Sequence, residues 1–225
     1  MKPMKYSLRA LARMLAYPDA AWHDQAGALI EAIDGEGVLG ASRRAELRAV
    51  VDQMRAMDDL DAESRYVATF DRGHATSLHL FEHVHGDSRD RGPAMIDLAQ
   101  TYRRAGLRLA ANELPDHLGA LLEFASTQPP GLARAFLGEI AHLLNRVFSA
   151  LQSRGSPYAA VIAAVIELAG QRAQAVEIEA DRPIDESWSE PQAFAGCSLN
   201  GQAKPGEPRP IHVMRGATQA RRPAA

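Results

Sequence analysis

Apolar residues recur every three to four positions over most of this sequence, which is the pattern of amphipathic α-helices. The pattern is clearest between about residues 129 and 152, where the recurring residues are Phe136, Ile140, Leu143, Leu144, Val147 and Leu151. No segment alternates with period two for longer than four residues, and no hairpin signal accompanies the β-branched residues. The sequence therefore predicts an all-α fold, a single helical bundle of roughly seven to nine helices.

The predicted helices follow one another with short connections. Proline, glycine or paired aspartates separate several of them, as expected where helices end. Their approximate ranges are 8–16, 20–33, 43–57, 61–70, 89–111, 118–125, 129–152 and 157–172.

The character of the sequence changes after about residue 175. Six of the thirteen prolines fall in residues 176–225, and apolar periodicity disappears there. Residues 176–190 carry six acids against the single Arg182, whereas residues 201–225 are basic. Such a segment cannot bury enough apolar surface to offset the entropy lost on ordering. We therefore expect one helical domain over residues 1–175 and a mobile, acidic-then-basic tail over residues 176–225.

Charge and cysteine content exclude several classes of protein. The formal net charge of −3 argues against a general nucleic-acid binder, which needs a basic excess. The single cysteine, Cys197, excludes an intramolecular disulfide and a four-thiolate zinc site. Arg9 and Arg13 interrupt the first apolar run, so it does not read as a secretory signal. The longest apolar run, residues 158–166, is far short of the ~20 residues that span a bilayer. We expect a soluble, cytoplasmic protein.

Four of the eight histidines lie close together, at positions 74, 79, 83 and 85. His79 and His83 are four residues apart and would share one helix face, which is compatible with two metal ligands. The stretch has no thiolate and no fixed third ligand, and the zincin order His-Glu-x-x-His is absent. The other interpretation is that these histidines satisfy buried backbone groups or cap a helix. We expect no bound metal, and a metal-dependent hydrolase using the His74–His85 cluster remains the alternative function.

Charged residues surround the histidines. Asp71–Arg72 precede Glu82, and Arg89–Asp90–Arg91 follow it. Two interpretations stay open: solvated helix ends, where ion pairs contribute little, or a buried network in which arginines clamp carboxylates. Glu82, Glu113, Asp116 and His117 could supply an acid and a base, but such groups are common in helical proteins. No nucleophile elbow, phosphate-binding loop or dinucleotide fingerprint is present. We do not predict an enzyme.

Several segments together resemble a known family. Residues 70–95 read FDRGHATSLHLFEHVHGDSRDRGPAM, and residues 112–118 read NELPDHL. Shorter matches are MLAYPD at 14–19 and MDDLD at 57–61. These segments resemble the nitrate reductase molybdenum cofactor assembly chaperones, the NarJ-type or delta-subunit family, and the likeness covers most of residues 8–175. The chain departs from the family at His79, where an apolar or aromatic residue is usual, and at Gly119, where the family tends to have proline.

The resemblance implies a helical, system-specific chaperone. Such proteins bind the catalytic α subunit of respiratory nitrate reductase through its N-terminal segment, which is similar to a vestigial twin-arginine signal. They permit insertion of the molybdenum guanine-dinucleotide cofactor and complex assembly before membrane attachment, and hold no stoichiometric cofactor themselves. Neither nucleic acid nor stable membrane association is implied. A third possibility, a subunit permanently bound to a membrane complex, stays open.

A helical bundle of this kind can present an apolar groove to an amphipathic helical peptide. Acids beside the groove would orient a basic peptide, and histidines could change its binding near neutral pH. The residues predicted to line or support the groove are Tyr66, Phe70, Asp71, Arg72, Leu78, Phe81, Glu82, His83, His85, Arg89, Arg91, Glu113, Asp116 and His117.

Overall fold

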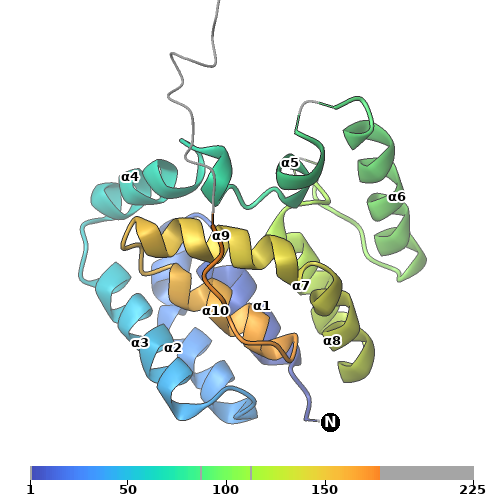
Figure 1. The fold of residues 1–225 in the computed structure, drawn as a ribbon. Coiled ribbons are helices and arrows are strands. Elements are labelled where there is room, and N and C mark those ends of the chain that lie inside the picture. The colour runs from blue at the N-terminus through green and yellow to red at the C-terminus, as the bar shows by residue number, and fades with distance from the viewer. Residues whose placement is uncertain (1, 87, 112, 178–225) are drawn as a thin grey trace, which may run out of the picture. The chain divides into compact units, whose positions relative to one another are not determined.

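Helices account for all regular structure in residues 2–86, 88–111 and 113–177, the part of the chain that the computed structural model describes (Figure 1). No strand occurs in these ranges. The all-α prediction is confirmed. The α-helices are α1 (Lys5–Met14), α2 (Ala20–Glu36), α3 (Ala41–Arg55), α4 (Asp59–Phe70), α5 (Leu80–His85), α6 (Arg91–Arg104), α7 (Leu118–Thr127), α8 (Pro130–Glu139), α9 (Ala141–Ser153) and α10 (Ala159–Leu168). A short 3-10 helix, η1, covers His74–Thr76.

The ten α-helices of the described residues exceed the predicted seven to nine. One reason is that the apolar stripe over residues 129–152 forms two helices instead of one. The chain turns at Ile140 (φ −92°, ψ 0°), soon after Gly138, whose helix propensity is low. The other reason is α5, whose six residues are too few to show a helical period. None of the described helices is long and apolar enough to cross a membrane.

The core is built around α10. Residues 161–166 of this helix are at most 1% exposed, because nearly every position is apolar and neighbours cover it on several sides. It packs against α9, α3, α1 and α8. The first helix, α1, packs mainly between α2 and α7, so the two halves of the described chain share one core.

Capping residues set the helix ends that the sequence indicated. The Asp19 carboxylate accepts a hydrogen bond from the Trp22 N–H (2.8 Å) and starts α2. Asp58 starts α4 in the same way, through the Leu60 N–H (3.0 Å). Gly37 ends α2 in the left-handed conformation (φ 56°), which glycine adopts without strain. Local sequence therefore fixes the register of these helices.

Aromatic packing attaches α4 to the core. The ring centroid of Phe70 lies 4.9 Å from that of Tyr66 and 4.8 Å from that of Tyr158. The Tyr66 hydroxyl donates a hydrogen bond to the Leu15 carbonyl (2.8 Å), which satisfies the polar end of a buried ring. The end of α4 is thereby fixed, and with it the start of the histidine-rich segment.

Residues 171–177, which we call the strap, run along α9. Gly170 (φ 84°) follows the end of α10, which stops at Leu168 instead of the predicted residue 172. The Gln174 N–H then donates to Asn145 Oδ1 (2.8 Å), and the Val176 N–H donates to Ser149 Oγ (2.9 Å). The predicted tail over residues 176–225 lies outside the described residues beyond residue 177. A domain boundary at residue 175 stays a prediction.

Candidate functional site

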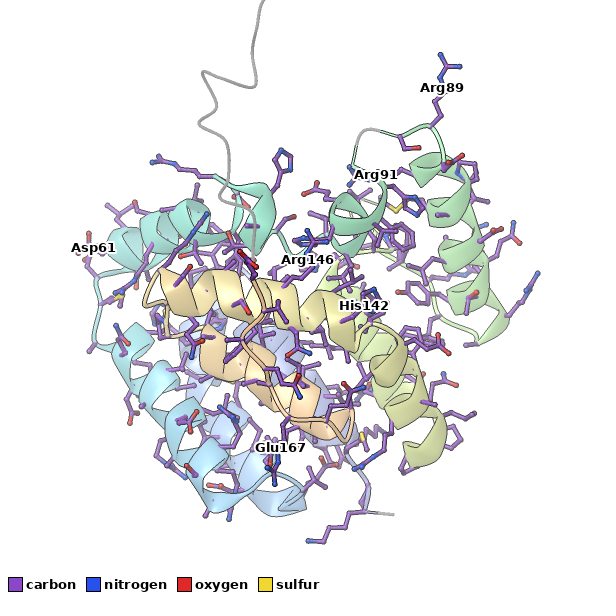
Figure 2. The ribbon with its side chains drawn as sticks, viewed as in Figure 1. Asp61, Arg89, Arg91, His142, Arg146 and Glu167 are labelled. Carbon is purple, nitrogen blue, oxygen red and sulfur yellow. The ribbon has the colours of Figure 1, made fainter. Side chains whose placement is uncertain are left out.

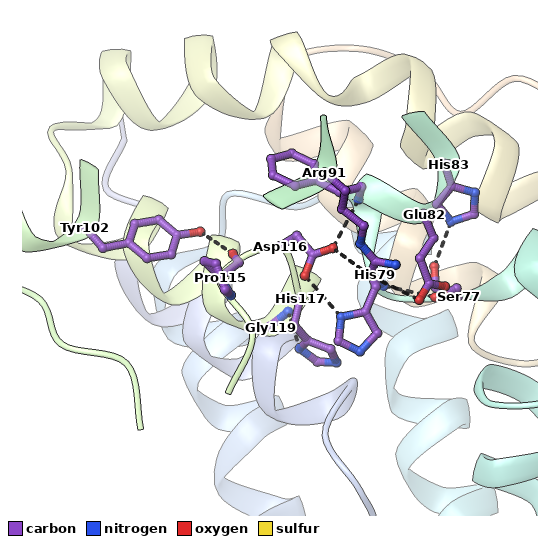
Figure 3. A network of polar contacts seen from close by, with 11 residues as sticks. Ser77, His79, Glu82, His83, Arg91, Tyr102, Pro115, Asp116, His117 and Gly119 are labelled. Atoms are coloured by element: carbon purple, nitrogen blue, oxygen red, sulfur yellow. Dashed lines mark hydrogen bonds and ion pairs between the residues drawn. The ribbon is translucent and has the colours of Figure 1, made fainter. Parts of the chain in front are cut away.

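Two segments far apart in the sequence pair beside α5 (Figure 3). The Leu118 N–H donates to the Leu78 carbonyl (2.8 Å), and the Leu80 N–H donates to the Asp116 carbonyl (3.0 Å). These bonds form an isolated antiparallel bridge between His79 and His117. The bridge places the histidine-rich segment against the start of α7, and it sets the positions of the polar side chains described next.

Asp116 is the centre of the polar network. Its side chain is 0% exposed, and a buried carboxylate is costly unless hydrogen bonds and opposite charges compensate it. Oδ1 accepts a hydrogen bond from His79 Nδ1 (3.2 Å), and Oδ2 accepts one from the Phe81 N–H (3.3 Å). Arg91 Nη2 lies 3.7 Å from Oδ2. Asp116 therefore joins the segments before α5 and α7.

Arg91 extends the network to α6. Its Nη2 also lies 3.3 Å from Glu82 Oε1. Because Arg91 is the first residue of α6 and Glu82 belongs to α5, this guanidinium connects two helices with the bridge. Arg91 thus forms a network with Glu82 and Asp116, but the network is partly exposed and uses one guanidinium nitrogen, so the buried clamp is met only in part. As the other interpretation expects, exposed positions are occupied by Asp71, Arg72 and Arg89.

The histidine rings have separate partners. His79 precedes α5 in an extended conformation and turns its ring toward Asp116. The His83 Nε2–H donates to the Ser77 carbonyl (2.9 Å). The expectation that His79 and His83 share a helix face is wrong, because α5 begins only at Leu80. Within the described residues, no three His, Cys, Asp or Glu side chains are grouped to hold a metal ion.

The two bridged histidines have pKa values shifted in opposite directions. The hydrogen bond to Asp116 raises the pKa of His79, against the opposing effect of burial. Burial lowers the pKa of His117, and the positive charge of a protonated His79, with ring centroids 5.1 Å apart, lowers it further. His117 Nδ1 also accepts a hydrogen bond from the Gly119 N–H (3.1 Å), which a proton on Nδ1 would abolish. A proline at position 119 would lack this donor. His79 thus favours the charged form and His117 the neutral form.

His83 behaves like His117. Burial lowers its pKa, and the guanidinium of Arg146 lowers it too, against the effect of the Ser77 carbonyl, which raises it. Arg146 comes from α9, and its Nη1 reaches the His83 carbonyl (3.5 Å). Figure 2 shows Arg146 and His142 on the side of α9 nearest the viewer. Arg146 therefore connects α9 to the C-terminal half of α5.

The structure brings about half of the predicted site residues into one place. The residues in or beside the network are Leu78, Phe81, Glu82, His83, Arg91, Asp116 and His117. His85 lies next to it, with its ring centroid 5.4 Å from that of Phe81.

The remaining predicted residues lie apart from the network. Tyr66 and Phe70 are buried in the aromatic cluster of α4, where they support the fold. Exposed positions are occupied by Asp71, Arg72, Arg89 and Glu113. Glu113 accepts a hydrogen bond from the Ala110 N–H (3.3 Å) in its own loop.

Four residues of the network were not among the predicted groove residues, and the first is His79, which was considered as a possible metal ligand. Ser77 accepts from His83 through its carbonyl, and Arg146 contacts the same histidine from 63 positions away. The Tyr102 hydroxyl donates to the Pro115 carbonyl (2.8 Å) and ties the second half of α6 to the bridge. The sequence could have indicated Tyr102, because a tyrosine within an apolar stripe needs a hydrogen-bond partner for its hydroxyl. Arg146 had no such local signal.

A hollow of about 650 Å³ lies elsewhere, among α3, α9, α10 and the strap. Its lining includes small residues such as Ala160 and Ala163 and the charged residues Arg43, Glu46 and Glu167. None of the predicted site residues lines it. The polar network and this hollow are separate features.

Comparison with known proteins gives consistent matches. The family model described as the nitrate reductase delta subunit matches residues 37–164. The nitrate reductase molybdenum cofactor assembly chaperone NarJ of Escherichia coli is 40% identical over 195 residues, which are 86% of this chain and 82% of that protein. The nitrate reductase-like protein NarX of Mycobacterium tuberculosis is 37% identical over 155 residues, 68% of this chain and 22% of that protein.

One solved structure has a similar fold. It is the crystal structure of a proposed redox enzyme maturation protein from Archaeoglobus fulgidus, with a TM-score of 0.56 and 19% identity. The match covers 76% of this chain and 96% of that one. At this identity the likeness concerns the fold alone.

Proposed function

This chain belongs to the nitrate reductase delta subunit family, and we propose that it is a system-specific chaperone of the catalytic α subunit of a respiratory nitrate reductase. The observation that carries the proposal is the 40% identity to the E. coli assembly chaperone over 86% of this chain. The family model also spans the whole polar network, from Ser77 to Arg146. The family resemblance noted in the sequence is confirmed.

The proposed action takes place in the cytoplasm, before the enzyme attaches to the membrane. The chain binds the N-terminal segment of the α subunit and keeps the apoenzyme open for the molybdenum guanine-dinucleotide cofactor. It then leaves, so that it is absent from the finished complex. In this proposal the chain is not an enzyme and carries no stoichiometric cofactor of its own.

The surface around α5 and α6 supports a peptide-binding role. Val84 of α5 and Ile96 of α6 are 53% and 60% exposed, and Phe81 of α5 is half-buried. Glu82 adds a carboxylate to the same short helix. An amphipathic helix with basic residues matches such a surface, because apolar anchors give affinity and opposite charges give orientation. We propose Glu82, Asp71 and Glu113 as the acids that meet the client.

The test is co-purification from cells that make both proteins. The tagged chain should recover α subunit that lacks molybdenum, and an α subunit without its N-terminal segment should be recovered poorly. Cells without the chain should accumulate α subunit with little molybdenum, measured by elemental analysis. Equal recovery of the shortened α subunit would place the contact elsewhere, and no recovery of either would contradict the proposal.

The same preparations also test the two alternative functions, a permanent subunit of a membrane complex and a metal-dependent hydrolase. A chain permanently bound to a membrane complex would be found at one copy per mature enzyme. A metal-dependent hydrolase would hold about one zinc or iron per chain, lost in His83→Ala. The His79 and His83 rings, held by different partners, give no support to the second case.

A further inference from the structure

The carboxylates of Glu82 and Asp116 point at the same nitrogen atom. Arg91 Nη2 lies 3.3 Å from Glu82 Oε1 and 3.7 Å from Asp116 Oδ2. Two acids from separate segments thus flank one cation position. Both distances exceed the roughly 2.7–2.9 Å of a strong charge-assisted hydrogen bond, and the contact uses one nitrogen instead of the bidentate guanidinium fork. The two carboxylates favour a cation at this position, and Arg91 supplies one through long contacts.

A cation from solution can reach this position. The side chains of Glu82 and Arg91 are 24% and 27% exposed, whereas that of Asp116 is 0% exposed. His79 and the Phe81 N–H hold the Asp116 carboxylate in place independently of Arg91. Displacing Arg91 therefore leaves the buried acid compensated, and exchanging a partly exposed ion pair costs little free energy.

Arg91 also restrains the helix that it begins. In the described part of α6, Tyr102 is the buried residue, and it anchors the C-terminal half through Pro115. The N-terminal half carries the exposed Ile96 and is joined to α5 through Arg91 and Glu82. Figure 2 shows Arg91 between α5 and α6, whereas Arg89 points away from the domain. Release of Arg91 would loosen the first turns of α6 beside the exposed apolar residues.

We infer that Glu82 and Asp116 form a binding subsite for a guanidinium or ammonium side chain of the client, and that Arg91 occupies it in the client-free chain as an internal competitor. The inference rests on the proposed function for the identity of the client. The inference makes a prediction that a simple acidic patch would not make. Removing Arg91 must strengthen the binding of a basic peptide, because the peptide no longer has to displace a resident cation.

Calorimetric titration compares two synthetic peptides with the N-terminal sequence of the α subunit, one natural and one with its arginines replaced by uncharged, isosteric citrulline. The chaperone variants are Arg91→Gln, Glu82→Gln, the double variant and Arg108→Gln. Arg108 is exposed in the loop after α6, so its variant removes one positive charge without vacating the subsite. Each variant must first keep the helical signal and melting behaviour of the natural chain.

Arg91→Gln should bind the natural peptide about threefold to tenfold more tightly than Arg108→Gln does. The citrulline peptide should show no such gain. Glu82→Gln should discriminate less between the two peptides than Arg108→Gln does, and it should cancel the gain in the double variant. A Kd for Arg91→Gln equal to or weaker than that of Arg108→Gln would overturn the inference. So would a discrimination between the peptides that is as large in Glu82→Gln as in Arg108→Gln, a measurement that does not depend on Arg91→Gln being folded.

Small probes keep this test separate from the proposed function. N-acetylarginine amide and N-acetylcitrulline amide are titrated into the same variants, and the Glu82 carboxyl resonance is followed by NMR. A response to the arginine probe that is at least about threefold stronger in Arg91→Gln than in Arg108→Gln supports the subsite. Equal responses overturn it. Failure of the natural chain to bind the α-subunit peptide would instead count against the proposed function alone.

Discussion

His79 Nδ1 donates a hydrogen bond to Asp116 Oδ1 at 3.2 Å, and these two residues hold together segments that are 37 positions apart. The bond joins a partly exposed imidazole to a carboxylate that is 0% exposed. The same carboxylate accepts from the Phe81 N–H, so it fixes both the side chain before α5 and the backbone of its first turn. This one acid therefore reinforces the backbone bridge between the two segments.

Asp116→Asn should lower the free energy of unfolding by about 2–3 kcal/mol. The amide keeps the shape but loses the charge that His79 and Arg91 contact, and it turns a donor toward one of them. Urea denaturation followed by circular dichroism measures the change. Glu123→Gln, an exposed acid on α7, is the matched control and should stay within about 0.5 kcal/mol of the natural chain. A similar small effect at Asp116 would contradict the assigned role.

The free energy of unfolding should decrease at acidic pH, and His117 should contribute to this decrease. Its pKa is lowered in the folded chain, so as pH falls through the ordinary histidine value of about 6.5 the unfolded chain binds a proton before the folded chain does. The free energy of unfolding therefore decreases as pH falls through this value. His117→Asn should make the decrease shallower, as measured by urea denaturation at several pH values. An unchanged slope would show that His117 titrates normally.

His79 should act in the opposite sense. Its pKa is raised in the folded chain, so its contribution is fully present below its ordinary value and is lost as pH rises through the folded value. His79→Asn should remove this loss on the alkaline side. It should also shift the pKa of His117 upward, because a nearby positive charge is gone. NMR titration of the His117 ring protons tests the coupling, and a pKa that does not move would refute it.

Helices and caps were predictable because their signals are local. Asp19 after Pro18, and Asp58, lie at the starts of α2 and α4, and the apolar stripes located most helices within a few residues. The exceptions are α5, the division between α8 and α9, and the end of α6, which comes at Arg104 instead of residue 111. The site was predictable in its residue types but not in its pairs. Nothing near Arg91 in the sequence indicates that Asp116 is its neighbour, and the spacing of His79 and His83 suggested a shared helix face because the start of α5 leaves no periodic signal.

The strap should contribute to stability, unlike the residues that follow it. A chain ending at Glu177 keeps the hydrogen bonds to Asn145 and Ser149 and should melt within a few degrees of the natural chain. A chain ending at Gly170 loses both bonds and the cover of Ala173 over the core. It should lose ~1–2 kcal/mol, or about 3–6 °C in Tm. Equal Tm values for the two truncated chains would show that the strap is dispensable.

Gly170→Ala should be destabilising by about 1–2 kcal/mol. The residue has φ 84°, which a side chain disfavours, and a Cβ there would lie 2.7 Å from the Arg134 guanidinium. Gly27→Ala is the matched glycine control. Gly27 is exposed in the middle of α2, and a Cβ added there would meet nothing within 4 Å, so the change should stabilise by about 0.5–1 kcal/mol. Thermal melts should show a lower Tm for Gly170→Ala and a higher Tm for Gly27→Ala than for the natural chain.

The packing of α1 against α7 has a consequence for synthesis on the ribosome. Arg9 Nε contacts Ser126 Oγ (3.2 Å) across 117 positions, and α7 supplies much of the surface that covers α1. At about 5–20 residues per second, α1 emerges on the order of ten seconds before its partner is made. During that interval α2 is the main neighbour available to cover its leucines. The nascent chain therefore passes through a state in which α1 is incompletely covered and open to aggregation or to capture by a general chaperone.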